Sequence, residues 1–145
     1  MTKWSQFRNL TERYQARFLL DVAAVATVQY GRPASVREQV REYIGLGYAL
    51  LAGDAEPLDD LLIFMQDPDL RRSFAALGEE LGDDEQVKAW MDIASYACAF
   101  VCRLAAERSG YGAVPEPVVE AIPGIYEYYM ERATSLGILE TDDGR

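Results

Sequence analysis

The sequence predicts an all-α protein: a single-domain bundle of about six helices around a central apolar helix at about residues 84–108. Three observations support this prediction. Apolar residues recur at helical spacing, no segment alternates in the manner of a strand, and Gly and Pro interrupt the pattern at helix-length intervals. Half of the 145 residues are apolar, which is enough for one core without disulfides or metals. We expect residues 1–140 to form the domain and residues 141–145 a flexible polar tail.

The first helix is expected over residues 10–30. Asn9 and Glu12 have the spacing of a capping box, in which each side chain binds the backbone N–H of the other residue. Gly31 and Pro33 follow the last turn and are typical helix terminators. The apolar positions between these signals are Phe18, Leu19, Val22, Val25 and Ala26.

The second helix is expected over residues 35–52, because Ser35 and Glu38 also have capping-box spacing. Gly45 and Gly47 lie inside this segment, where a glycine costs about 1 kcal/mol relative to alanine. We therefore expect both glycines to allow the close approach of a neighbouring helix. A short third helix is expected over residues 58–66.

The fourth helix is expected to begin at Asp67-Pro68, with the proline in its first turn, and to run to about residue 81. The fifth is expected over residues 84–108, with Gly110 closing it. It is apolar nearly all round, so we expect neighbours on several sides. A last helix should begin near Pro117, kink at Pro123-Gly124 and continue to about residue 136. The expected buried stripe of that helix is Ile125, Tyr129, Ala133 and Leu136.

The charge balance limits the classes of partner. Asp and Glu number 24 against 14 Lys and Arg, which gives a net charge of −10. Such a surface repels nucleic acids and anionic lipids and attracts basic proteins, although acidity can also serve solubility alone. The N-terminal residues lack the apolar core of a secretory signal, and the apolar run at residues 93–102 is short for a membrane span. We therefore expect a cytoplasmic protein that binds neither nucleic acid nor membrane.

The chain contains no histidine, which removes the commonest general base and metal ligand. It also lacks the glycine-rich phosphate-binding and nucleophile-elbow motifs. Cys98 and Cys102 lie four residues apart in an apolar run and are expected to be small buried side chains, not a disulfide or zinc site. We expect no catalytic residue, no cofactor and no metal, and hence a protein that is not an enzyme.

Acidic residues gather at the turns on either side of residues 58–81. These clusters are solvated loops or the docking surface of a basic protein, and the candidate partner-binding residues are Asp54, Glu56, Asp59, Asp60, Glu79, Glu80, Asp83, Asp84 and Glu85. Two pairs among them, Glu56 with Asp59 and Glu80 with Asp83, have the three-residue spacing with which all-helical nucleotide phosphohydrolases hold magnesium. A magnesium-dependent phosphohydrolase is therefore an alternative, although acidic residues are also common at helix N-termini.

The last helix adds a weaker candidate surface. When its expected stripe faces the core, Tyr128 lies near the solvent side, with Glu127 and Glu131 beside it. An exposed tyrosine among acids resembles an interface anchor, and the alternative is a partly covered tyrosine that lies along a neighbouring helix. We include these three residues among the candidate partner-binding residues.

In its order of elements, most of the chain resembles the small all-helical immunity proteins of bacterial polymorphic-toxin systems. The similar segments are NLTERYQARFLLDVA, WMDIASYACAFVCRLAAERSG and VPEPVVEAIPGIYEYY. The resemblance implies a non-enzymatic inhibitor that binds a cognate toxin domain. A basic nuclease cleft would suit an acidic partner. A self-associating structural or regulatory domain is the remaining alternative.

Overall fold

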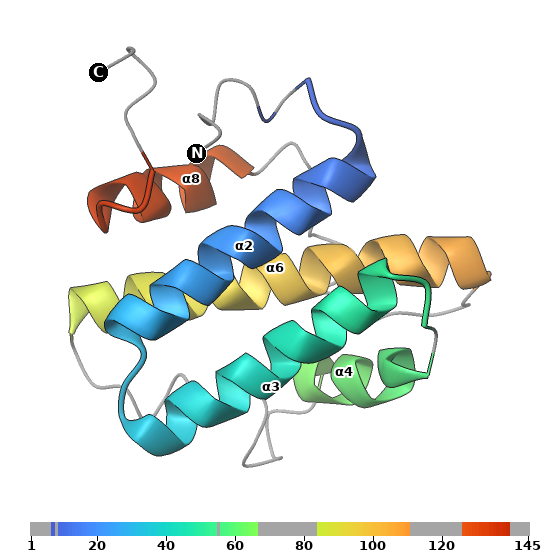
Figure 1. Cartoon of the computed structure of the whole chain (residues 1–145), viewed down its shortest axis with the longest axis horizontal. Helices are drawn as coiled ribbons and strands as arrows, with labels where there is room; N and C mark the ends of the chain where they lie inside the picture. Colours follow the sequence, from blue (N-terminus) through green and yellow to red (C-terminus); the bar gives the residue numbers. More distant parts are fainter. Residues whose placement is uncertain (1–6, 8, 55, 67–83, 111–125, 140–145) are drawn as a thin grey trace.

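The computed structural model describes residues 7, 9–54, 56–66, 84–110 and 126–139. Every regular element in these ranges is an α-helix, so the prediction of an all-α protein is confirmed. The described helices are α2 (Glu12–Tyr30), α3 (Ala34–Leu51), α4 (Pro57–Gln66), α6 (Glu85–Ser109) and α8 (Tyr126–Ser135) (Figure 1). The expected fourth helix, the kink at Pro123-Gly124 and the polar tail lie outside the described residues. The count of about six helices therefore stays a prediction.

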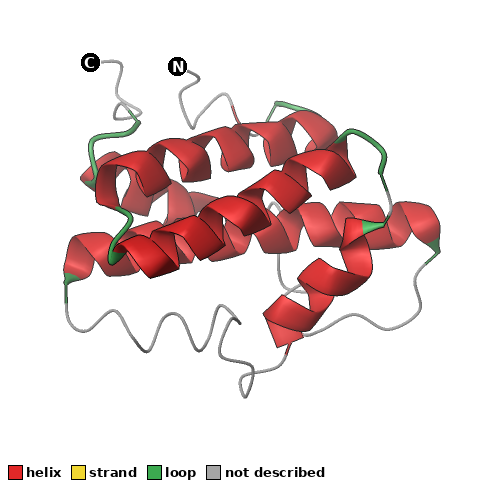
Figure 2. Cartoon of the chain, turned by 60° about the horizontal axis from the view of Figure 1, so that its bottom comes forward, coloured by secondary structure: helices red, strands yellow, loops and turns green. Residues whose placement is uncertain are grey.

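α6 contacts each of the other four described helices. α2 and α3 lie side by side over it, and α8 lies near the end at which α6 begins (Figures 1 and 2). Asp84 caps the helix by accepting the backbone N–H of Gln86 at 2.9 Å and of Val87 at 3.2 Å. Gly110 ends it with a φ of 68°, a left-handed conformation that glycine adopts without strain. The predicted bounds of this helix therefore hold to within one residue.

Burial along α6 extends round most of its circumference. Tyr96 and Phe100 are buried as well as the side chains opposite them, which are Val87, Trp90, Ala94, Ala97, Cys98, Val101 and Ala105. By length and composition alone α6 could cross a membrane, but 83% of its most apolar window is buried inside the molecule. That burial is what packing between neighbouring helices produces.

The first two helices begin at different residues from those that the capping boxes predict. Thr11, not Asn9, precedes α2, and α3 begins at Ala34, so Ser35 lies within the helix. Pro33 occupies the cap position of α3, and its carbonyl accepts the N–H of Arg37 at 3.0 Å. Proline lacks an N–H and has a fixed φ suited to a helix start, which explains the earlier beginning.

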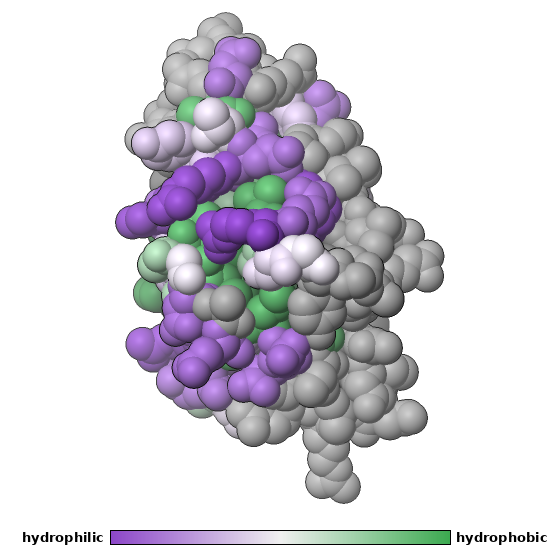
Figure 3. Space-filling model, turned by 90° about the vertical axis from the view of Figure 1, so that its right-hand side faces the viewer, coloured by the Kyte–Doolittle hydropathy of each residue, from purple (hydrophilic) through white to green (hydrophobic). Residues whose placement is uncertain are grey.

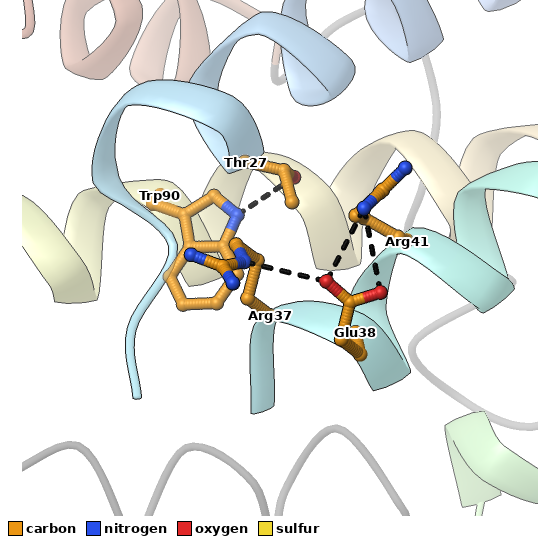
Figure 4. A network of polar contacts seen from close by, with 5 residues as sticks. All are labelled: Thr27, Arg37, Glu38, Arg41 and Trp90. Carbon is orange, nitrogen blue, oxygen red and sulfur yellow. Dashed lines mark hydrogen bonds and ion pairs between the residues drawn. The ribbon is translucent and has the colours of Figure 1, made fainter. Parts of the chain in front are cut away.

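The seam between α2 and α6 contains a buried polar contact. The indole N–H of Trp90 donates to Thr27 Oγ1 at 2.9 Å, and that hydroxyl donates to the carbonyl of Ala23 at 2.7 Å. Figure 4 shows the first of these bonds beside the ion pairs of Glu38 with Arg37 and Arg41 on α3. The hydroxyl therefore gives the only polar atom of the tryptophan side chain a partner inside the core.

The two glycines of α3 have different surroundings. A Cβ atom at Gly47 would lie 3.0 Å from Leu20 Cδ2, so α2 and α3 approach closely at this point, as predicted. A Cβ atom at Gly45 would meet nothing within 4 Å, and this residue is exposed. The expectation of a close approach at Gly45 is therefore wrong.

The buried face of α8 differs in part from the predicted stripe. Ala133 and Leu136 are buried and Tyr129 is half-buried, in keeping with the prediction, whereas Ile125 lies outside the described residues. Tyr126 and Met130 are also buried, and Tyr126 stacks on Phe7 at 4.7 Å between ring centroids. Phe7 provides a second apolar surface for this helix, which widens the buried face toward Tyr126.

Candidate functional site

Four of the predicted partner-binding residues lie together where the chain passes from α3 to α4. Asp54, Glu56, Asp59 and Asp60 are all exposed, and we call this set the acidic corner. Gly53, with a φ of 106°, turns the chain out of α3 in a conformation that other residues rarely adopt. Asp54 Oδ1 then accepts the backbone N–H of Glu56 at 3.1 Å, which holds the turn.

The orientation of the acidic corner follows from the apolar side of α4. Leu58, Leu61 and Leu62 are buried against the core, so Asp59 and Asp60 point to solvent in the first turn. Carboxylates are favourable there because the free backbone amides give a helix N-terminus a partial positive charge. No Lys or Arg lies between residues 41 and 71, so the segment that forms this corner is acidic in sequence.

The structure describes only part of the second predicted acidic cluster. Glu79, Glu80 and Asp83 lie outside the described residues, whereas Asp84 and Glu85 lie at the beginning of α6. Asp84 caps that helix and forms an ion pair with Arg32. These contacts, first the N–H of Val87 and then Arg32, lower the pKa of Asp84. Asp84 therefore stabilises the helix start.

The described parts of the two acidic clusters lie at opposite ends of α6. Arg108, near the end of this helix, donates to the carbonyl of Leu50 at 3.0 Å. Leu50 precedes the acidic corner by only a few residues, so the corner lies near this end of α6. Asp84 lies at the other end, and a helix of this length extends over about 35 Å. Asp84 and Glu85 therefore do not share a contact patch with the acidic corner.

The three candidate residues on α8 are exposed, and 53% of the Tyr128 surface is accessible. The ring of Tyr128 lies 5.6 Å from the guanidinium carbon of Arg132, and Arg132 in turn forms an ion pair with Asp92 at 2.8 Å. Tyr128 also meets Tyr129 edge to face at 5.0 Å. Glu127 and Glu131 therefore lie around a partly covered tyrosine with a cation beside it, which weakens the negative field there.

The structure tests the magnesium alternative only in part. Glu56 and Asp59 are exposed at the acidic corner, whereas the convergence of Glu80 and Asp83 with them involves residues that are not described. Within the described ranges, no group of three or more Asp, Glu, Cys or His side chains could hold a metal ion. The predicted magnesium site therefore remains untested as a whole.

The two cysteines are free thiols buried in α6, as expected. Burial raises the pKa of Cys102 to about 12, and the pKa of Cys98 is raised for the same reason. A thiol that keeps its proton is a poor nucleophile and a poor metal ligand. Their environment therefore suits packing and not thiol chemistry.

The prediction from sequence missed a groove at the end of the bundle where α2 begins and α3 and α6 end. It consists of two adjoining hollows of about 300 and 170 Å³, and Arg13 and Leu51 line both. We call it the arginine groove, and its other lining residues are Tyr14, Arg17, Tyr48, Leu50, Ala52, Val101, Leu104, Ala105 and Arg108. A sequence signal exists in Arg13 and Arg17, which lie four residues apart on one helix face beside the exposed Tyr14.

Comparison with known proteins gives no match: no family model, curated protein or solved structure is significantly similar to the chain. The acidic corner can form charge-assisted hydrogen bonds to Lys and Arg of a partner, and the arginine groove can accept apolar and anionic groups.

Proposed function

We propose that this chain is an immunity protein that binds and neutralises a basic bacterial toxin domain through the acidic corner. The observation that carries this proposal is the set of four exposed carboxylates in a segment without a basic residue, in a chain with a net charge of −10. Opposite charge accelerates the encounter of two proteins, and paired charges then orient the complex. A toxin that cleaves nucleic acid needs a basic cleft, which the acidic corner could occupy.

The acidic corner is a better contact surface than the other candidate acids that the structure describes. Asp84 already caps α6 and pairs with Arg32, and Glu85 lies 3.8 Å from Lys88. The α8 carboxylates surround a tyrosine whose ring lies against Arg132. At the acidic corner, Asp59 and Asp60 lie in the first turn of a helix whose opposite side is buried in the core, so their backbone is already in helical conformation before a partner binds.

In this proposal the protein acts in the cytoplasm as a stoichiometric partner, without a cofactor or a catalytic step. Inhibition by occupation of a substrate cleft needs only surface complementarity and a stable scaffold. The absence of histidine is compatible with that role, because a binding surface requires no general base.

Co-expression tests the proposed function. The chain is produced together with the toxin domain encoded by the neighbouring reading frame, and both growth and co-purification are measured. We expect wild-type protein to restore growth and to co-purify with the toxin. The variant Asp54→Asn/Glu56→Gln/Asp59→Asn/Asp60→Asn should do neither while remaining folded.

The matched control is Glu127→Gln/Glu131→Gln on α8, which also removes negative charge from exposed helix positions. We expect this control to protect cells as wild type does. Protection by the corner variant would contradict a role for the acidic corner. Failure of the wild-type chain to bind the toxin would contradict the proposed function itself.

A further inference from the structure

The arginine groove combines an apolar floor with a cationic rim. Leu51 is buried, Leu104 is half-buried, and Val101 and Ala105 complete the floor from α6. Arg13 and Arg108 border the same hollow from α2 and α6, and Figure 3 shows apolar surface between hydrophilic side chains at this end of the bundle. An apolar floor with a few charged groups at its edge is the usual composition of a site that holds one anchoring side chain.

The three rim arginines differ in how their charge is balanced. Arg17 pairs with Asp21 at 3.2 Å, and its guanidinium carbon lies 5.4 Å from the centre of the Tyr48 ring. Arg108 donates to a backbone carbonyl, which carries no full negative charge. Arg13 forms no ion pair with any part of the chain that the structure describes. The rim therefore presents two cations whose charge no carboxylate in the described residues balances.

We propose that the arginine groove binds a short acidic peptide segment of another protein, with an aliphatic or aromatic side chain on the floor and flanking carboxylates on Arg13 and Arg108. Charge complementarity selects this occupant. A carboxylate fits the fork of an arginine donor, and the floor removes one anchor side chain from water. Tyr14, which is 65% exposed, lines the adjoining hollow and offers the segment a second aromatic surface.

The net charge argues against two other occupants. A second copy of this chain also carries a charge of −10, so two copies repel each other at long range. A nucleic acid presents a long row of phosphates, and the whole surface would repel it. A short acidic segment has few charges outside the groove, so the local attraction of Arg13 and Arg108 dominates. This inference does not depend on the proposed function.

The test is a titration of ¹⁵N-labelled full-length protein with synthetic peptides, followed by NMR. The probe is the blocked hexapeptide EDLFDE. Its matched peptides are QNLFNQ, which lacks the charges, and EDSSDE, which lacks the anchor. We expect EDLFDE alone to shift amide resonances along the groove in α2, α3 and α6, and we expect Arg13→Glu to weaken its binding about tenfold or more. Arg41→Glu, at an exposed arginine outside the groove, should leave the binding unchanged.

Several results would overturn the proposal. These are an unchanged spectrum on addition of EDLFDE, shifts confined to residues away from the groove, and equal binding of EDLFDE to the Arg13→Glu variant. Equal shifts with EDSSDE or with inorganic phosphate would indicate a small-anion site instead of a peptide groove. Light scattering that shows a dimer of wild-type protein and a monomer of Arg13→Glu would assign the groove to a second copy of the chain.

Discussion

The indole N–H of Trp90 donates to the hydroxyl of Thr27 across 2.9 Å in the seam between α6 and α2. Both residues are buried, at 0% and 1% exposure, so water cannot replace either partner. A core polar contact of this kind fixes the relative register of the two helices that form it. The α2–α6 seam leads to the groove at one end and to the Asp84 cap at the other.

Replacement of Thr27 by valine keeps the shape of the side chain and removes the hydroxyl. The indole N–H of Trp90 then has no acceptor, so we expect the free energy of unfolding to fall by about 1–3 kcal/mol in urea denaturation. The control Thr27→Ser loses only a methyl group and should cost less. Equal or greater stability of Thr27→Val would show that the hydrogen bond contributes nothing.

The two glycines of α3 should differ in their response to alanine. Gly45→Ala gains helix propensity in open space, so we expect about 0.5–1 kcal/mol of stabilisation. Gly47→Ala gains the same propensity but places its Cβ 3.0 Å from a methyl of the fully buried Leu20. We expect it to be less stable than Gly45→Ala in thermal or urea unfolding. Equal stabilisation by both substitutions would contradict the close approach of α2 and α3.

Asp84 should make stability depend on pH. Its pKa lies below the ordinary value of 3.8, so its carboxylate stabilises the fold above the unfolded-state pKa, and this contribution is lost as the pH falls through the folded-state pKa. We expect Asp84→Asn, which keeps a capping oxygen and loses the charge, to be less stable than wild type at neutral pH. The difference in urea midpoint should shrink below about pH 4. A difference that stays constant down to about pH 2 would contradict this assignment.

The thiols of Cys98 and Cys102 should react with a disulfide reagent such as DTNB only after unfolding. Both side chains are fully buried, so the reagent cannot reach them, and burial raises the pKa of both thiols. Neither thiol therefore forms the reactive thiolate at neutral pH. We expect slow release of thionitrobenzoate from native protein and rapid release in denaturant. Rapid reaction of native protein would show that α6 opens locally or is packed differently.

The sequence predicted best those features that depend on local signals. The bounds of α6 were predicted to within one residue, and the structure shows that the Asp84 cap and Gly110, which act within a few residues, set them. The capping box at Ser35 failed because Pro33 offered a competing start two residues earlier. Glu38 pairs instead with Arg37 and Arg41 on the helix surface.

Those parts of the candidate site that could not be predicted from the sequence depend on tertiary packing. The exposure of the acidic corner could be predicted, because polar residues around Gly53 and Pro57 mark a surface turn. The arginine groove could not, because Arg13 and Arg108 come together only when α2, α3 and α6 converge. Its apolar floor also appears in sequence as ordinary core residues of two separate helices, α3 and α6.

Calorimetric titration of the purified toxin domain with the corner variant is the most direct test of the central claim. The variant neutralises Asp54, Glu56, Asp59 and Asp60, and circular dichroism must first show that it is folded. We expect it to bind about tenfold or more weakly than wild type, and the wild-type affinity to fall as salt rises. Unchanged affinity of the variant, or wild-type affinity that does not depend on salt, would contradict binding through the acidic corner.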